Sequence, residues 1–158
     1  MIIRKFQDSD INQIVSLFYE TVHTINAQDY SADQLQAWAP KDEKFAKISA
    51  WKVSLSRNIT YIAEMNGEIV GFADMTSEGH LDRFYVHKDY QGQGIAFALV
   101  NRLEAEAKEL GLAEMDTEAS ITAKPFFERQ GYQSIQLQVV ERKGVKLVNF
   151  KMTKQLSN

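Results

Sequence analysis

The chain contains no cysteine and only three histidines. Without cysteine it can form no disulfide, no thiolate metal site and no acyl-cysteine intermediate, so any group transfer must be direct or use another nucleophile. The histidines, His23, His80 and His87, are scattered along the chain, and on a strand His80 and His87 would point to opposite faces. The sequence therefore predicts no metal site.

Long hydrophobic runs are also missing. The opening stretch MIIRKFQDSD turns polar too early for a signal peptide, and no later apolar run approaches the length of a membrane span. A net charge of −3 with dispersed basic residues gives no broad attraction to nucleic acid. We therefore expect a cytoplasmic protein without membrane or nucleic-acid partners, in which local backbone N–H groups hold any anionic ligand.

What is present is the composition of one globular domain over residues 1–158, with 44% hydrophobic residues, 25% charged residues and two prolines. Apolar residues recur at helical spacing from Ile11 to about Thr24 and again over 45–55. Between these segments, Ser31 is suited to cap a short helix that Pro40 ends. The first third of the chain is therefore predicted to be mostly helical.

From residue 58 the hydrophobic period becomes that of strands. The runs ITYIAEM and EIVGFADM are joined by Asn66-Gly67, a pair that suits a tight hairpin turn. The pattern then predicts a strand at HLDRFYVH, a helix over 94–110, a strand at LAEMDTEA, a short helix at ITAKPFFERQ, and a closing pair, YQSIQLQVV and VKLVNFKMT. The expected order is α-α-β-β-β-α-β-α-β-β. This is an α+β or mixed α/β fold with a central, largely antiparallel sheet.

The stretch FYVHKDYQGQGIAFALV places a strand, a glycine turn and a helix in direct succession. Gly92 and Gly94 allow close backbone approach to a bulky anion, and the helix start adds unpaired N–H donors, so the turn suits a pyrophosphate. The alternative is a tight connection without a ligand. A P-loop would need lysine and a hydroxyl residue in place of Ile95 and Ala96, and a dinucleotide fold would need glycine in place of Phe97.

This stretch resembles the Gln/Arg-x-x-Gly-x-Gly/Ala signature of the GCN5-related N-acetyltransferase (GNAT) superfamily, with Gln91, Gly94 and Ala96 in the signature places and Gly92 in a commonly filled glycine slot. AKPFFERQGY resembles a later helix of that superfamily, and YSADQLQAWAP, ASITAKPFFERQGYQ and the closing VNFKM are similar to its YafP-like branch. The resemblance implies a twisted, mostly antiparallel sheet of about six to seven strands flanked by about four helices, with splayed strands that bind acyl-CoA.

The same resemblance implies an N-acyltransferase that moves an acetyl group from acetyl-CoA directly to a primary amine of a small molecule or peptide, as a monomer or homodimer. Its expected coenzyme contacts are Phe84, Tyr85, Val86, Gln91, Gly92, Gln93, Gly94, Ile95, Ala96, Phe97, Ser120, Lys124, Phe126 and Phe127. Among them, Lys124 is expected to contact a phosphate. For Phe126 and Phe127, ordinary core packing is the alternative.

Direct transfer requires a neutral amine, so a base must take a proton from it. The resemblance places His80 where the family often has a glutamate for this purpose, and Asp82 is either its orienting partner or the base itself. A polar strand start without a catalytic role is the alternative. A tyrosine that often protonates the leaving thiolate is replaced here by Phe127, so water or Tyr132 is expected to supply that proton.

The irregular segment after the first helix is expected to select the acceptor, with His23, Tyr30 and Trp38 as an aromatic wall. All three can equally belong to the core. Three functions remain open: a catalytic N-acyltransferase, a non-catalytic acyl-CoA sensor domain in which Phe127 prevents turnover, and a helix-rich interaction module without a coenzyme.

Overall fold

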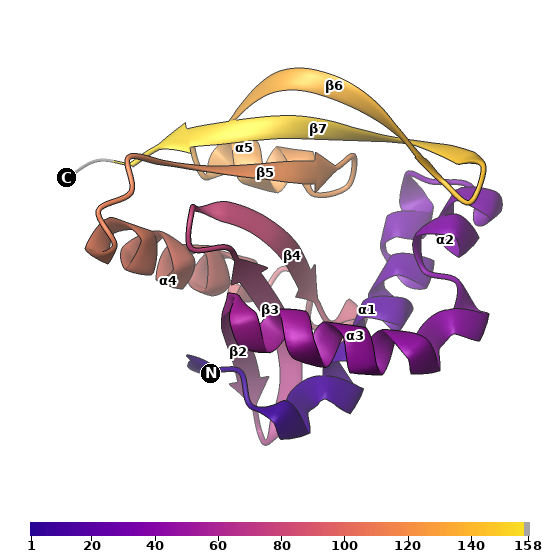
Figure 1. Ribbon diagram of the computed structural model, residues 1–158, viewed down its shortest axis with the longest axis horizontal. Coiled ribbons are helices and arrows are strands. Elements are labelled where there is room, and N and C mark those ends of the chain that lie inside the picture. Colours follow the sequence, from indigo (N-terminus) through magenta and orange to yellow (C-terminus); the bar gives the residue numbers. More distant parts are fainter. Residues whose placement is uncertain (157–158) are drawn as a thin grey trace.

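A computed structural model describes residues 1–156, and the strands within this range form one seven-stranded sheet in the order β1-β2-β3-β4-β5-β7-β6 (Figure 1). Neighbouring strands are antiparallel except β4 and β5, which are parallel. The predicted mixed α/β fold with a largely antiparallel sheet is confirmed. In chain order the elements are β1 Ile2–Lys5, α1 Ile11–Thr24, α2 Ala32–Trp38, α3 Lys44–Arg57, β2 Ile59–Met65, β3 Glu68–Met75, β4 His80–Val86, α4 Ile95–Glu109, β5 Glu114–Ser120, α5 Lys124–Arg129, β6 Gln133–Arg142 and β7 Val145–Gln155.

Three α-helices precede β2, one more than the predicted element order contains. The start of α2 is set by a capping box: the Gln34 backbone N–H donates to Ser31 Oγ over 3.2 Å, and the Ser31 N–H donates to Gln34 Oε1 over 2.8 Å. Pro40 then separates α2 from α3, because a proline in a helix interior lacks the N–H that the helix needs.

Strand β1 was absent from the predicted order. It is four residues long and pairs only with β2, from Ile2 opposite Glu64 to Lys5 opposite Tyr61. So short a segment carries no periodic signal of its own, and the hydrogen bonds to β2 define it. By contrast, the hairpin between β2 and β3 was predicted, and Asn66 and Gly67 adopt the expected positive φ values of 53° and 78°.

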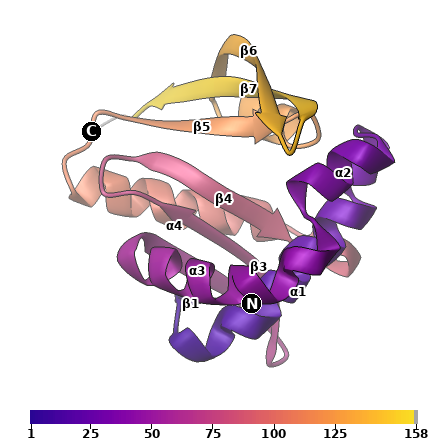
Figure 2. The ribbon, with the colours of Figure 1, turned by 45° about the vertical axis from the view of Figure 1, so that its right-hand side comes forward.

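Helices cover both faces of the sheet (Figure 2). Successive side chains of β2 point to opposite faces of the sheet, so the hydrophobic core consists of two clusters. Ile62 packs in the cluster that contains residues of α1, α2 and α3, and Tyr61 packs in the cluster that contains residues of α4. Gly71 on β3 lets α4 approach, because a Cβ atom there would lie 2.9 Å from Ile95 Cγ2. Within residues 1–156, no helix is long and apolar enough to cross a bilayer.

The parallel pair β4 and β5 is joined only at its beginning. The ladder consists of His80 opposite Asp116 and Leu81 opposite Thr117, and Thr117 Oγ1 adds a 2.9 Å hydrogen bond to the Leu81 carbonyl. Beyond this point the strands diverge, which Figures 1 and 2 show as a widening separation between β4 and β5. The splayed strands expected from the resemblance are therefore present, and they leave one edge of β4 unpaired with β5.

Candidate active site

Two clefts meet where β4 and β5 separate. The larger has a volume of about 520 Å³ and lies among the ends of these strands, the glycine turn, α4 and α5. The smaller, of about 150 Å³, lies between the same strands and the β6-β7 hairpin. The residues that line both clefts are Trp38, Asp82, Tyr85, Glu118 and Ser120. A group held in one cleft can thus reach a group held in the other through the gap in the sheet.

The glycine turn opens into the larger cleft. Gly92 and Gly94 have φ values of 74° and 81°, and a Cβ atom on either would meet no other atom within 4 Å. Gly94 is the N-cap residue of α4, and no side chain caps the helix. The first N–H groups of α4 and its positive dipole end are therefore available to an anion, and the open space over both glycines fits the pyrophosphate of coenzyme A.

Gln91 holds this turn against the end of β4. Its Nε2 atom donates to the Val86 carbonyl over 2.8 Å and to the His87 carbonyl over 3.3 Å, and Thr21 Oγ1 of α1 also donates to the Val86 carbonyl, over 3.1 Å. Because the amide group of Gln91 is used in these bonds, its side chain shapes the turn, and the neighbouring backbone provides the donors.

Aromatic rings form the wall of the larger cleft opposite the turn. The rings of Phe84 and Phe126 are stacked with centroids 5.4 Å apart, and Phe127 packs against both. Phe127 is 1% exposed, so it belongs to the core as well as to the cleft lining. Phe97, in the first turn of α4, also lines the cleft but is 52% exposed, and a bound ligand would cover it.

The cation in this cleft is Arg129, which the sequence analysis did not select. Lys124 does not line the cleft, and its ammonium group lies 3.1 Å from Glu128 Oε2. Arg129 does line it and forms no ion pair with any residue of the described chain. The sequence spacing indicates that Arg129 lies on the cleft side of α5, because it is three residues after Phe126 and so shares a helix face with it.

A β-bulge lies at Asp82 on β4. On β3, Asp74 and Met75 are adjacent, but their partners on β4 are Arg83 and Leu81, which leaves Asp82 as the extra residue. The bulge is anchored from the α3 side, where the buried Asp74 carboxylate lies 2.6 Å from Arg83 Nη1. The side chain of Asp82 is 45% exposed and lines both clefts.

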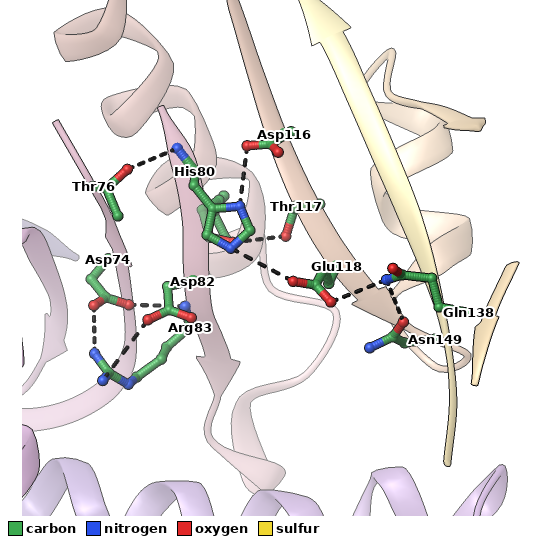
Figure 3. Close-up of polar contacts among 11 residues, drawn as sticks. Asp74, Thr76, His80, Asp82, Arg83, Asp116, Thr117, Glu118, Gln138 and Asn149 are labelled. Atoms are coloured by element: carbon green, nitrogen blue, oxygen red, sulfur yellow. Dashed lines mark hydrogen bonds and ion pairs between the residues drawn. The ribbon is translucent and has the colours of Figure 1, made fainter. Parts of the chain in front are cut away.

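The imidazole of His80 points toward β5 and contacts two carboxylates there (Figure 3). Its Nδ1 atom lies 3.1 Å from Asp116 Oδ1, and its Nε2 atom lies 4.0 Å from Glu118 Oε1. An ionised carboxylate only accepts hydrogen bonds, so a neutral imidazole that is bonded to Asp116 donates from Nδ1 and keeps Nε2 as an acceptor. His80 lines the smaller cleft. His80 thus contacts Asp116, and within residues 1–156 it forms no hydrogen bond or ion pair with Asp82, which the sequence offered as its orienting partner or as the base itself.

Asp116 and Glu118 were not selected from the sequence. Their alternation in EMDTEAS places them on one strand face. The sequence pattern does not show that β4 pairs in parallel with β5, and this pairing sets His80 opposite Asp116.

Four predicted site residues line neither cleft, namely Gln93, Lys124, Tyr132 and His23. Tyr132 is 2% exposed, and its hydroxyl donates to the buried Glu104 Oε2 over 2.9 Å. Burial and the Glu104 carboxylate raise the pKa of Tyr132 far above its usual range, so the structure does not place a proton donor for the thiolate there. His23 Nε2 lies 2.7 Å from the Ala39 carbonyl, away from either cleft.

The other predicted acceptor residues do line the smaller cleft. Trp38 and Tyr30 meet edge to face there, with ring centroids 5.2 Å apart. The Tyr30 hydroxyl donates to the Val148 carbonyl over 2.6 Å and accepts from the Ile121 N–H over 2.9 Å. Tyr30 therefore holds β7 and the end of β5 in place, in addition to lining the cleft. Ser120 also lines both clefts, and its Oγ atom accepts the Ala123 N–H over 3.0 Å.

Residues 26–154 match the acetyltransferase (GNAT) domain family, so the chain belongs to the GNAT family and is an acyl-CoA-dependent N-acetyltransferase. It is 37% identical over 150 residues to the uncharacterised N-acetyltransferase YafP of Escherichia coli K12, an alignment that spans 95% of this chain and 93% of that protein.

Solved structures of N-acetyltransferases have the same fold as this chain. A GCN5-related N-acetyltransferase from Rhodopseudomonas palustris superposes with a TM-score of 0.91 at 34% identity, covering 98% of this chain and 95% of that one. The PaiA N-acetyltransferase of Thermoplasma acidophilum, solved with coenzyme A, has the same fold, with a TM-score of 0.79 at 17% identity and coverage of 98% of both chains. Of the three functions left open by the sequence, these findings support the first, an enzyme that uses acetyl-CoA.

Proposed function

We propose that the larger cleft binds acetyl-CoA and that the amine acceptor, a small molecule or a peptide, enters from the smaller cleft, so that the two react at the gap between β4 and β5. The observation that carries this proposal is that both clefts share the lining residues Trp38, Asp82, Tyr85, Glu118 and Ser120. Bound acetyl-CoA supplies the thioester carbonyl that the amine attacks. The turn at 92–94 and the start of α4 hold the pyrophosphate, and Arg129 contacts a phosphate.

His80 is the proposed general base. His80 lines the smaller cleft, and in the neutral imidazole that donates from Nδ1 to Asp116 over 3.1 Å, Nε2 is the atom that can accept a proton. When Nε2 takes the proton of the ammonium group, directly or through water, the carboxylates of Asp116 and Glu118 stabilise the resulting imidazolium. Asp82, at the gap between the strands, attracts the positively charged amine before it loses its proton.

The backbone of β4 beyond Leu81 is proposed to provide hydrogen-bond donors where negative charge develops on the thioester oxygen, because its edge toward β5 is unpaired there. The bond from nitrogen to the carbonyl carbon forms and the carbon–sulfur bond breaks; the thiolate departs without a protein acid, and the second proton of the attacking nitrogen passes to water. Phe127 has no hydroxyl, Tyr132 is buried, and a thiolate with a pKa of about 8.5 is a good leaving group.

The test is release of free thiol from acetyl-CoA with a panel of amines, measured against pH. His80→Gln should lower kcat by about a hundredfold or more and remove the acidic limb of the pH profile, with unchanged calorimetric affinity for coenzyme A. Asp116→Asn should lower kcat as well, because the tautomer of His80 is no longer fixed. His23→Gln is the control, since His23 lines neither cleft.

If His80→Gln keeps the native rate and pH profile, and Asp82→Asn loses the acidic limb of that profile, the base is Asp82 instead. Failure of coenzyme A to bind the native protein would overturn the proposed site altogether.

A further inference from the structure

The smaller cleft has a charge pattern that bears on the acceptor. Two carboxylates line it, those of Asp82 and Glu118, with side chains 45% and 46% exposed. The Asp82 carboxylate lies 3.9 Å from Arg83, but the guanidinium of Arg83 is already bound to Asp74 at 2.6 Å. The Asp82 carboxylate is therefore available to a positively charged amine, and Glu118, which accepts from Gln138 Nε2 over 3.0 Å and lies 4.0 Å from His80 Nε2, adds negative charge to the same cleft.

The smaller cleft also holds a cation. Arg142, the last residue of β6, lines the cleft and forms no ion pair with any residue between 1 and 156. Its charge reaches the neighbouring groups: burial raises the pKa of the Tyr85 hydroxyl, and Arg142 is among the cations that oppose this rise. Tyr85 lines the same cleft, and both Arg142 and Asp82 act electrostatically on its hydroxyl.

The size of the cleft limits what fits beside these charged groups. About 150 Å³ is below the range of about 300–1,000 Å³ that is typical of pockets for drug-sized ligands. Tyr30, Trp38 and Leu147 also line the cleft and give it apolar surface. A polycation would be attracted by the two carboxylates but repelled by Arg142, whereas a simple alkylamine would leave Arg142 without a partner.

We infer that the acceptor is a small amine that also carries an anionic group, the chemistry of a free amino acid, with its nitrogen beside Asp82 and Glu118 and its anion on Arg142. This inference rests on the proposed function, because it takes the smaller cleft to be the acceptor site. Arginine suits the anion because its planar guanidinium can bind both oxygens of a carboxylate.

The experiment compares amino acids with their uncharged amides. The probes are the L-α-amino acids and the ω-amino acids from glycine to aminohexanoate, each paired with its primary amide, and spermidine and kanamycin as polycations. Thiol release is measured at saturating acetyl-CoA. At least one amino acid should have a kcat/KM tenfold or more above that of its amide and above those of both polycations.

Arg142→Gln should remove this preference by raising KM for the amino acid at least tenfold and leaving KM for the amide unchanged. Lys146→Gln is the matched control, because Lys146 is an exposed cation on the same hairpin that does not line the cleft. Equal effects of the two substitutions would overturn the inference, as would a panel in which amides or polycations are the better substrates.

The inference also fails if acetyl-CoA binds and no amino acid releases thiol above the rate with water. That result would leave the coenzyme site intact, whereas loss of coenzyme binding would refute the proposed function itself. The two failures are thus distinguishable in one set of measurements.

Discussion

Replacing Gly94 by alanine should separate backbone strain from coenzyme binding. Gly94 has a φ of 81°, and a Cβ atom there meets no protein atom within 4 Å. The substitution therefore adds no clash, and its cost to folding is the left-handed conformation itself, about 1–2 kcal/mol. In a chain of this length that corresponds to a fall in Tm of about 2–8 °C. The variant should remain folded.

Its methyl group would instead occupy the open space over the start of α4. A hydrogen bond from a backbone N–H to a charged group contributes about 1.5–3 kcal/mol, so displacing one such contact with the pyrophosphate should weaken coenzyme A binding about ten- to hundredfold. The assays are calorimetric titration with coenzyme A and the rise in Tm that coenzyme A produces. At a hundred times its dissociation constant this ligand adds about 2.7 kcal/mol to the native protein.

Gly111→Ala provides a matched control. Gly111 has a φ of 79° and equally open surroundings, but it follows the other end of α4 and lines neither cleft. Both variants should lose similar stability without ligand, and Gly94→Ala alone should lose affinity for coenzyme A. If Gly94→Ala binds coenzyme A as tightly as the native protein, the pyrophosphate does not lie on this turn.

Three further predictions concern other parts of the molecule. Tyr132→Phe should lower the free energy of unfolding by about 1.5–3 kcal/mol, because Glu104 loses a buried hydrogen bond, and should leave kcat unchanged; a large fall in kcat with little loss of stability would restore Tyr132 as the acid. Phe127→Tyr should change kcat by less than tenfold, since a thiolate departs without an acid, and a tenfold rise, about 1.4 kcal/mol of barrier, would contradict this. Burial alone would raise the pKa of Asp10, but hydrogen bonds from Arg4 and from the Gln7 backbone N–H lower this pKa in the folded protein. The ionised Asp10 therefore stabilises the fold above its unfolded pKa of about 3.9, and this stabilisation is lost as the pH falls through the lower pKa of the folded state. Asp10→Asn should therefore destabilise the protein more at pH 7 than at pH 3 in urea unfolding, and an equal effect at both pH values would show that the pair is not coupled to folding.

Local sequence patterns were sufficient where a backbone conformation needs a particular residue. Asn66-Gly67 predicted the first hairpin, Ser31 predicted the cap of α2, and the two glycines at 92 and 94 predicted the turn, because positive φ values and helix caps are satisfied by residues a few positions apart. Strand β1 has no such signal, since only its pairing with β2 makes it a strand.

The sequence by itself therefore determined the turn, the helices, the hairpins and, through the signature at 91–96, the family. Only the tertiary structure decided which side chains meet. His80 and Asp116 are 36 positions apart and come together through the short parallel ladder of β4 and β5. The same packing directs the hydroxyl of Tyr132 to Glu104 in the core and brings Arg142 of β6 to the cleft that Asp82 enters from β4. Such contacts depend on the arrangement of whole strands, and no periodicity along one segment records them.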